Sequence, residues 1–130
     1  MIYVLNINNV ENSTSNGLEV GKNVIKASFT GLKNDFAFLD AAGDFSASKN
    51  GYTFKEDENV KKFEAGFDVM TMYYLKENGD LYSIYVGDEK KLDEGIEDFA
   101  YAGSNSLAVI KNFDKKIKQG DICYISKHNI

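Results

Sequence analysis

The chain has 130 residues, of which 43% are hydrophobic and 13% aromatic, so it has enough apolar mass for one folded domain and is not a disordered segment. Acidic residues outnumber basic ones by 20 to 15, and all 15 are lysine; because the bidentate guanidinium of arginine is missing, we expect no nucleic-acid partner. No apolar run approaches the roughly 18 residues of a membrane span and we see no secretory leader, so we expect a cytoplasmic protein with no membrane partner.

The first predicted element is a strand at residues 2–5, and from residue 23 the sequence repeats itself with a period of 36. Eleven of the 44 residues from 23 to 66 are identical to the residue 36 positions further on. A fixed period of roughly 20 to 50 residues indicates one supersecondary unit copied in tandem, with each copy burying its apolar face against the next. We therefore predict a single domain, 1–130, with repeats at about 23–58, 59–94 and 95–130 after a part-repeat at 1–22.

Each repeat reads as short strands joined by tight turns. Residues 36–39 and 45–48 are β-prone runs around a short turn that contains Gly43. In the second copy, Asn78-Gly79 followed by Asp80 occupies the equivalent turn between two β-prone runs. Glycine is common where a turn needs a positive φ, so Gly43, Gly79 and Gly120 are predicted to occupy equivalent hairpin turns.

Two weaker segments, 60–63 and 96–99, place apolar residues three apart, and there a single helical turn competes with a strand. We predict strands, because four short elements fit into 36 residues and a helix would crowd them. Each repeat is therefore expected to be a four-stranded unit of about 36 to 41 residues.

The third copy differs from the others by an insertion at residues 112–119. Where the second copy turns with two residues, this stretch predicts a longer loop of the kind that repeat proteins often use for binding. The candidate partner-binding residues are Phe113 and Ile117 with the neighbouring Lys115 and Lys116.

Catalytic and metal-binding chemistry is not expected. Cys123 and His128 are the single thiol and the single imidazole, and a base near a fraying terminus is poorly placed to activate a nucleophile. Cys123 is predicted to be a small buried residue and His128 a solvated one. The acidic runs 56–58 and 93–94 are interpreted as solvated turns, with calcium as the alternative. We predict no enzyme, no cofactor and no metal.

Residues 60–66 and 72–84, the latter containing Leu-Lys and Gly-Asp-Leu-Tyr, resemble the bacterial form of the regulator-of-chromosome-condensation repeat, and residues 96–111 resemble it again. The resemblance extends over about residues 20–126. Members of that family are β-propellers, so the resemblance implies a scaffold of β-blades for protein contacts. The units here are shorter, number about three and lack the family's Gly-Gln-Leu-Gly stretch, so nucleotide exchange on a small GTPase is not expected.

Two all-β architectures fit the repeat. Apolar residues on both faces of 69–75 and 81–86 favour propeller-like blades sandwiched between neighbours, and since three blades do not close a ring, we expect a homo-oligomer to complete it. The alternative is a β-trefoil monomer, which needs twelve strands. The chain being a piece of a longer array of repeats is a third possibility.

Two functional classes follow from these architectures. The first is an acidic protein-binding module, an inhibitor or adaptor of a bacterium or phage. The expected source follows from the composition, because many Lys, Asn and Ile residues with no Pro and no Arg indicate AT-rich codons. The alternative is a carbohydrate-binding module with Tyr52 and Tyr85 as aromatic platforms. Position 52 becomes Asp88 in the next copy, which counts against equivalent sugar sites.

Overall fold

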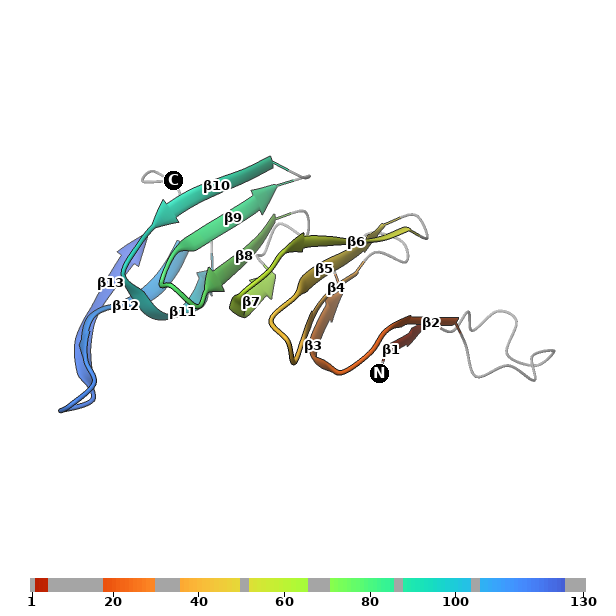
Figure 1. Ribbon diagram of the computed structural model, residues 1–130. Helices are drawn as coiled ribbons and strands as arrows, with labels where there is room; N and C mark the ends of the chain where they lie inside the picture. The colour runs from red at the N-terminus through yellow and green to blue at the C-terminus, as the bar shows by residue number, and fades with distance from the viewer. Residues whose placement is uncertain are drawn as a thin grey trace.

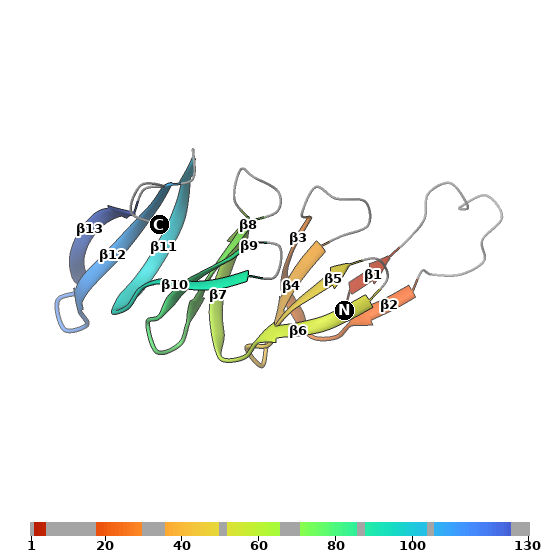
Figure 2. The same cartoon turned by 90° about the horizontal axis from the view of Figure 1, so that it is seen from above.

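The computed structural model describes residues 2–4, 18–29, 36–49, 52–65, 71–85, 88–103 and 106–125, and all its regular elements there are β-strands, which confirms the all-β class. Thirteen antiparallel strands form four sheets that lie in a row (Figures 1 and 2). We number the sheets I to IV in chain order.

Within each sheet, strands that follow one another in the sequence lie side by side. Sheet I contains β1 (Ile2–Val4) and β2 (Leu18–Gly21). Sheet II contains β3 (Val24–Phe29), β4 (Phe36–Asp40), β5 (Phe45–Lys49) and β6 (Tyr52–Asp57). Sheet III contains β7 (Val60–Ala65), β8 (Thr71–Lys76), β9 (Leu81–Tyr85) and β10 (Asp88–Asp93). Sheet IV contains β11 (Ile96–Gly103), β12 (Ser106–Asp114) and β13 (Gln119–Ile125).

The predicted hairpins of sheets II and III are present and share one turn geometry. Gly43 has a φ of 91° and Gly79 a φ of 92°, a conformation that L side chains rarely adopt. The Gly43 amide donates to the Asp40 carbonyl at 3.1 Å, and the Gly79 amide donates to the Lys76 carbonyl at 3.0 Å. Both turns therefore need glycine for the reason that the sequence suggested.

The prediction for Gly120 is wrong, because this residue lies in strand β13 and not in a turn. A Cβ atom at Gly120 would be only 2.8 Å from the Lys111 carbonyl oxygen and 2.9 Å from Cγ2 of Ile110. Glycine is required here by the close approach of the neighbouring strand, where the register of β12 and β13 shifts between Lys111 and Asp114.

Short connections hold successive sheets in place. Asn23, Asn59 and Gly95 occupy equivalent turns between sheets, all with positive φ. The amide of Val60, at the start of sheet III, donates to the Gly43 carbonyl at 2.9 Å, and the amide of Ile96, at the start of sheet IV, donates to the Gly79 carbonyl at 2.9 Å. The hairpin turn of one sheet is thus a docking point for the first strand of the next sheet.

Sheet III is sandwiched between sheets II and IV, as the two apolar faces of its strands predict. On β8, Met72 and Tyr74 belong to the core shared with sheet II, whereas Tyr73 and Leu75 belong to the core shared with sheet IV. Separate sheets stacked face to face in a row are blades, so the β-trefoil alternative is wrong. Segments 60–63 and 96–99 lie in β7 and β11, so the predicted strands are confirmed over the one-turn helix.

The row of sheets is open. Sheet I lies at one end and sheet IV at the other, and the two ends are far apart in both views (Figures 1 and 2). None of the described residues forms a helix that is long and apolar enough to cross a membrane.

Candidate functional site

The insertion in the third copy lengthens a hairpin and does not form the predicted long loop. Residues 112–114 continue strand β12 and Gln119 begins β13, so only residues 115–118 form the turn. Asn112 and Lys118 adopt positive φ values of 53° and 56°, which lets the two strands remain paired across the irregular register. We call β12, β13 and this turn the terminal hairpin, and its tip projects beyond the turns of the other sheets (Figure 1).

The four candidate partner-binding residues lie together at the end of the terminal hairpin. Lys115, Lys116 and Ile117 are exposed in the turn, and Ile117 is 60% accessible to solvent. The Asp114 carboxylate accepts the amide of Lys116 at 2.9 Å, which fixes the start of the turn. The tip therefore presents an exposed aliphatic side chain surrounded by lysines.

Phe113 is half-buried at the base of this tip and lines two adjoining hollows. One hollow, of about 480 Å³, extends toward the turn that contains Gly79, and the other, of about 510 Å³, extends toward Ile110. Both hollows share Phe113 with Lys61 and Glu97. We call them together the hairpin groove.

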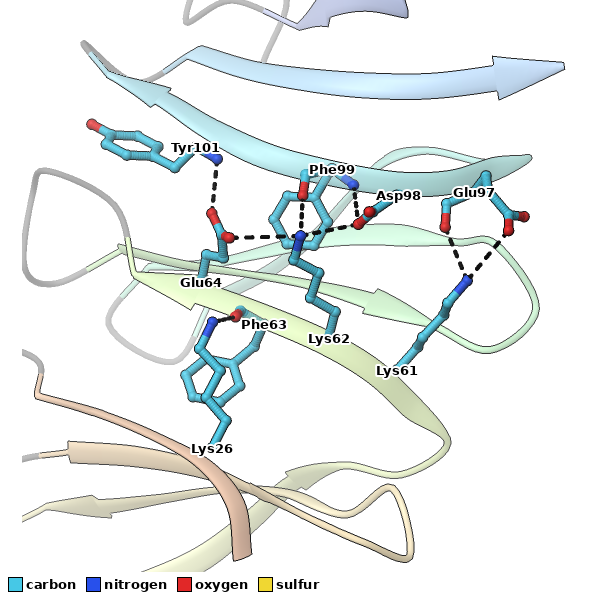
Figure 3. Close-up of polar contacts among 9 residues, drawn as sticks. All are labelled: Lys26, Lys61, Lys62, Phe63, Glu64, Glu97, Asp98, Phe99 and Tyr101. Atoms are coloured by element: carbon cyan, nitrogen blue, oxygen red, sulfur yellow. Dashed lines mark hydrogen bonds and ion pairs between the residues drawn. The ribbon is translucent and has the colours of Figure 1, made fainter. Parts of the chain in front are cut away.

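Lys61, Lys62, Glu97 and Asp98 form one wall of the hairpin groove. Ion pairs join these residues between sheets III and IV (Figure 3). Lys61 Nζ donates to the Glu97 carbonyl at 2.9 Å, and Lys62 Nζ is 3.0 Å from Asp98 Oδ1. Burial acts to raise the pKa of the Asp98 carboxyl, but the hydrogen bonds from Lys62 and from the Phe99 amide, with the charges of both lysines, outweigh it and lower the pKa. The lowered pKa favours the ionised form of Asp98, and both lysines of the wall are held in place by backbone carbonyl acceptors.

The same lysine contact occurs at both joints between successive sheets from II to IV. Lys26 on β3 donates to the Phe63 carbonyl of sheet III, and Lys62 on β7 donates to the Phe99 carbonyl of sheet IV (Figure 3). Each ammonium group also lies over the ring of the phenylalanine it contacts, 4.8 Å from the centroid for Lys26 and 5.1 Å for Lys62.

A second repeated contact joins the outer strand of one sheet to the next sheet, and it corrects the interpretation of the acidic runs. Asp57 accepts hydrogen bonds from the Tyr74 hydroxyl and Lys76 Nζ, both at 3.0 Å, and Asp93 accepts one from Lys111 Nζ at 2.8 Å. These two aspartates are half-buried and link successive sheets, so they are not solvated turn residues. In each case a lysine of the following sheet donates a hydrogen bond to the carboxylate. Their recurrence 36 residues apart is the sequence signal that could have identified them.

The prediction that Cys123 is buried is wrong. It lies in β13, as expected, but this is the outer strand of sheet IV and the thiol is exposed. His128 lies outside the described residues, so the structure does not place it near Cys123. Among the described residues, no group of three or more His, Cys, Asp or Glu side chains could hold a metal ion.

The two candidate sugar platforms lie at the hairpins between the third and fourth strands of sheets II and III. Tyr52 begins β6 and is 77% exposed, whereas Tyr85 ends β9 and is 50% exposed. They occupy different strands of equivalent hairpins, Tyr52 opposite Lys49 and Tyr85 opposite Asp88. The two tyrosines therefore do not form equivalent sites.

The chain matches no family model and no curated relative. Among solved structures, it is similar to the crystal structure of the N-terminal domain of Nup159, with a TM-score of 0.54 and 14% sequence identity. The match covers 89% of this chain and 36% of that domain, so the chain spans about a third of the length of its structural neighbour. That neighbour is a β-propeller, and the likeness shows a propeller-like fold. The resemblance to regulator-of-chromosome-condensation repeats stays a prediction.

Proposed function

We propose that this chain is a non-enzymatic, cytoplasmic protein-binding module, an inhibitor or adaptor from a bacterium or phage, which binds its partner with the terminal hairpin. The observation that carries the proposal is the tip itself. It projects beyond the other turns (Figure 1). Within it, Ile117 is 60% exposed and lies in the sequence between Lys116 and Lys118. A single exposed apolar side chain is common on protein surfaces. Ile117 is combined here with a projecting tip and with the adjoining hairpin groove lined by Phe113, so a partner seated on both would bury apolar surface from each.

The hairpin groove gives the proposed partner a second contact. Phe113 supplies an apolar floor, and Lys61, Glu97 and Lys115 supply polar groups at its edges. Small apolar centres with a polar rim are typical of protein interfaces. The lysines at the tip favour a partner surface that is acidic around an apolar pocket, although the chain as a whole has a net charge of −5.

The test is to capture partners with the tagged full chain, identify one by mass spectrometry, and measure its dissociation constant by calorimetry. Ile117→Ser and the double change Lys115→Glu with Lys116→Glu are each expected to weaken binding at least about tenfold, or about 1.4 kcal/mol. Ile117→Ser is cleaner than a change at Phe113, because Phe113 is half-buried.

The matched control is Tyr52→Ser, which removes another exposed large side chain, 77% exposed, from sheet II. It should leave the dissociation constant unchanged. Binding that survives both hairpin variants but is lost in the control would show that the hairpin is not the contact surface.

A carbohydrate-binding module is the second candidate, and the exposure of Tyr52 and Tyr85 supports it. Aromatic rings that face solvent can stack on sugar rings. This function predicts binding to a glycan array that Tyr52→Ala or Tyr85→Ala abolishes and Ile117→Ser does not change. An array with no binding above background would remove this candidate.

A further inference from the structure

The outer face of sheet IV repeats a surface that is buried in sheets II and III. Each of these sheets has a pair of directly opposed apolar residues on its second and third strands: Leu39 with Phe45 in sheet II, and Leu75 with Leu81 in sheet III. All four are at most 2% exposed, because the next sheet covers them. In sheet IV, Ile110 pairs with Ile122 at the same place in the hairpin.

In sheet IV no described sheet packs over this pair, and Ile122 is exposed while Ile110 is half-buried. Ile122 is 76% exposed and Tyr124, on the same strand and face, is 73% exposed. The strands alternate, so Leu107 and Val109 point into the core with sheet III while Ala108 and Ile110 point the other way. We call this surface the end face, formed by Ala100, Ala108, Ile110, Ile122 and Tyr124, and it contains a shallow hollow of about 160 Å³.

We propose that the end face binds a second copy of this chain, which docks its N-terminal end, sheet I, against sheet IV in head-to-tail fashion. The argument is continuity with the joints inside the molecule. Twice in the row, a face with this apolar pair is covered by a further sheet of the same chain. In both cases the covering sheet is the next one along the sequence. The sheet that such a face fits is therefore another sheet of this protein.

The end face also differs from the inner joints, and the difference bears on affinity. Asp98 occupies the position of Lys26 and Lys62 and is already paired with Lys62 at 3.0 Å. No lysine is left there to contact a backbone carbonyl of the incoming sheet, so the apolar pair supplies the binding. We expect an association that depends on concentration, weaker than the joints within one chain, where the linker raises the effective concentration.

Head-to-tail association has a defined consequence for assembly. A heterologous contact either closes into a ring or continues as an open chain. Two copies carry twice the four sheets of one chain, at the upper end of the range of about four to eight blades found in closed propellers. This inference does not depend on the proposed role of the terminal hairpin tip.

The experiment measures the mass of the full chain by sedimentation over a wide concentration range. Wild-type protein is expected to exceed the 14.5 kDa of one chain as concentration rises, and Ile122→Lys is expected to stay at that mass. The matched control is Tyr52→Lys, the same change at an equally exposed position on sheet II, which should associate as wild type does. Circular dichroism should show all three folded. A monomeric wild type, or equal association by all three proteins, would overturn the proposal.

Mixing the variants tests the direction of docking. A tagged Ile122→Lys chain has lost its end face but keeps sheet I, so it should still capture untagged wild-type protein, and it should not capture untagged Ile122→Lys. Failure to capture wild type, while wild type associates with itself, would show that two end faces bind each other and would overturn the head-to-tail arrangement.

Discussion

The joint between sheets III and IV and the end face of sheet IV use the same strand positions under opposite conditions. At the joint, Leu75 and Leu81 are fully buried beneath residues such as Phe99 and Val109. At the end face, Ile110 and Ile122 form the corresponding pair, and Ile122 is mostly in water. The comparison teaches that in a row of blades the energetic value of a residue depends on whether another sheet follows it. The predictions below compare such positions, beginning with the largest expected effect.

Cavity-forming substitutions should separate the two regions most clearly. Leu81→Ala is expected to lower the free energy of unfolding by about 2–5 kcal/mol, because the side chain is completely buried between two sheets. Ile122→Ala removes a similar side chain from an exposed position and should change it by less than about 0.5 kcal/mol. Chemical denaturation at low protein concentration measures both. Equal losses would show that the end face is covered within a single chain.

The hairpin turn at Gly79 within sheet III and the connection at Gly95 between sheets III and IV can be compared by placing asparagine at each glycine. Gly79→Asn should cost about 1–3 kcal/mol of unfolding free energy, because its φ is 92° and a Cβ atom would lie 3.3 Å from the Ile96 amide nitrogen. Gly95→Asn should change stability by less than about 0.5 kcal/mol, since a Cβ there meets nothing within 4 Å and the equivalent Asn23 and Asn59 already adopt positive φ. A Gly95 variant as unstable as the Gly79 variant would contradict this account.

The ionic joint between β10 and sheet IV makes stability depend on pH. Burial acts to raise the pKa of Asp93, but hydrogen bonds from Lys111 and the Glu94 amide outweigh it, so the folded-state pKa lies below its ordinary value of 3.8. The unfolded chain therefore takes up a proton first as the solution is acidified, and the stabilisation is present above pH 3.8 and lost below the folded pKa.

Asp93→Asn should accordingly lower the free energy of unfolding at neutral pH, by up to about 1 kcal/mol for a partly exposed pair. Thermal melts at neutral and strongly acidic pH should show that the difference between the variant and wild type narrows on acidification. A difference that stays constant would mean that the Asp93 carboxylate does not contribute through its charge.

The tip of the terminal hairpin should be the least sensitive region. Ile117→Ser is expected to change the free energy of unfolding by less than about 0.5 kcal/mol, because Ile117 is exposed in a four-residue turn. Phe113→Ser should cost more, since Phe113 is half-buried at the base of the groove. Melting temperatures of the two variants provide the measurement, and a large loss in Ile117→Ser would indicate that the tip packs against the body of the protein.

The sequence by itself determined the class and spacing of the elements. Glycine before aspartate between β-prone runs identified the turns at Gly43 and Gly79, because a positive φ is a local requirement that few residues meet. Apolar residues on both faces of β8 identified a sheet with a neighbour on each side, because strand side chains alternate. The candidate residues at the hairpin tip were also readable, since an insertion breaks a regular period.

Only the tertiary structure decided which residues are exposed in sheet IV and which side chains are paired between sheets. Gly120 lies in a strand, Cys123 is exposed, and Asp57 and Asp93 are held by lysines of the following sheet. Each of these outcomes depends on which strand lies beside the residue or which sheet lies above it. Local sequence fixes the conformation of a turn or strand, but burial and ion pairing depend on contacts between sheets, and the residues at the end of a row look in sequence like those in its middle.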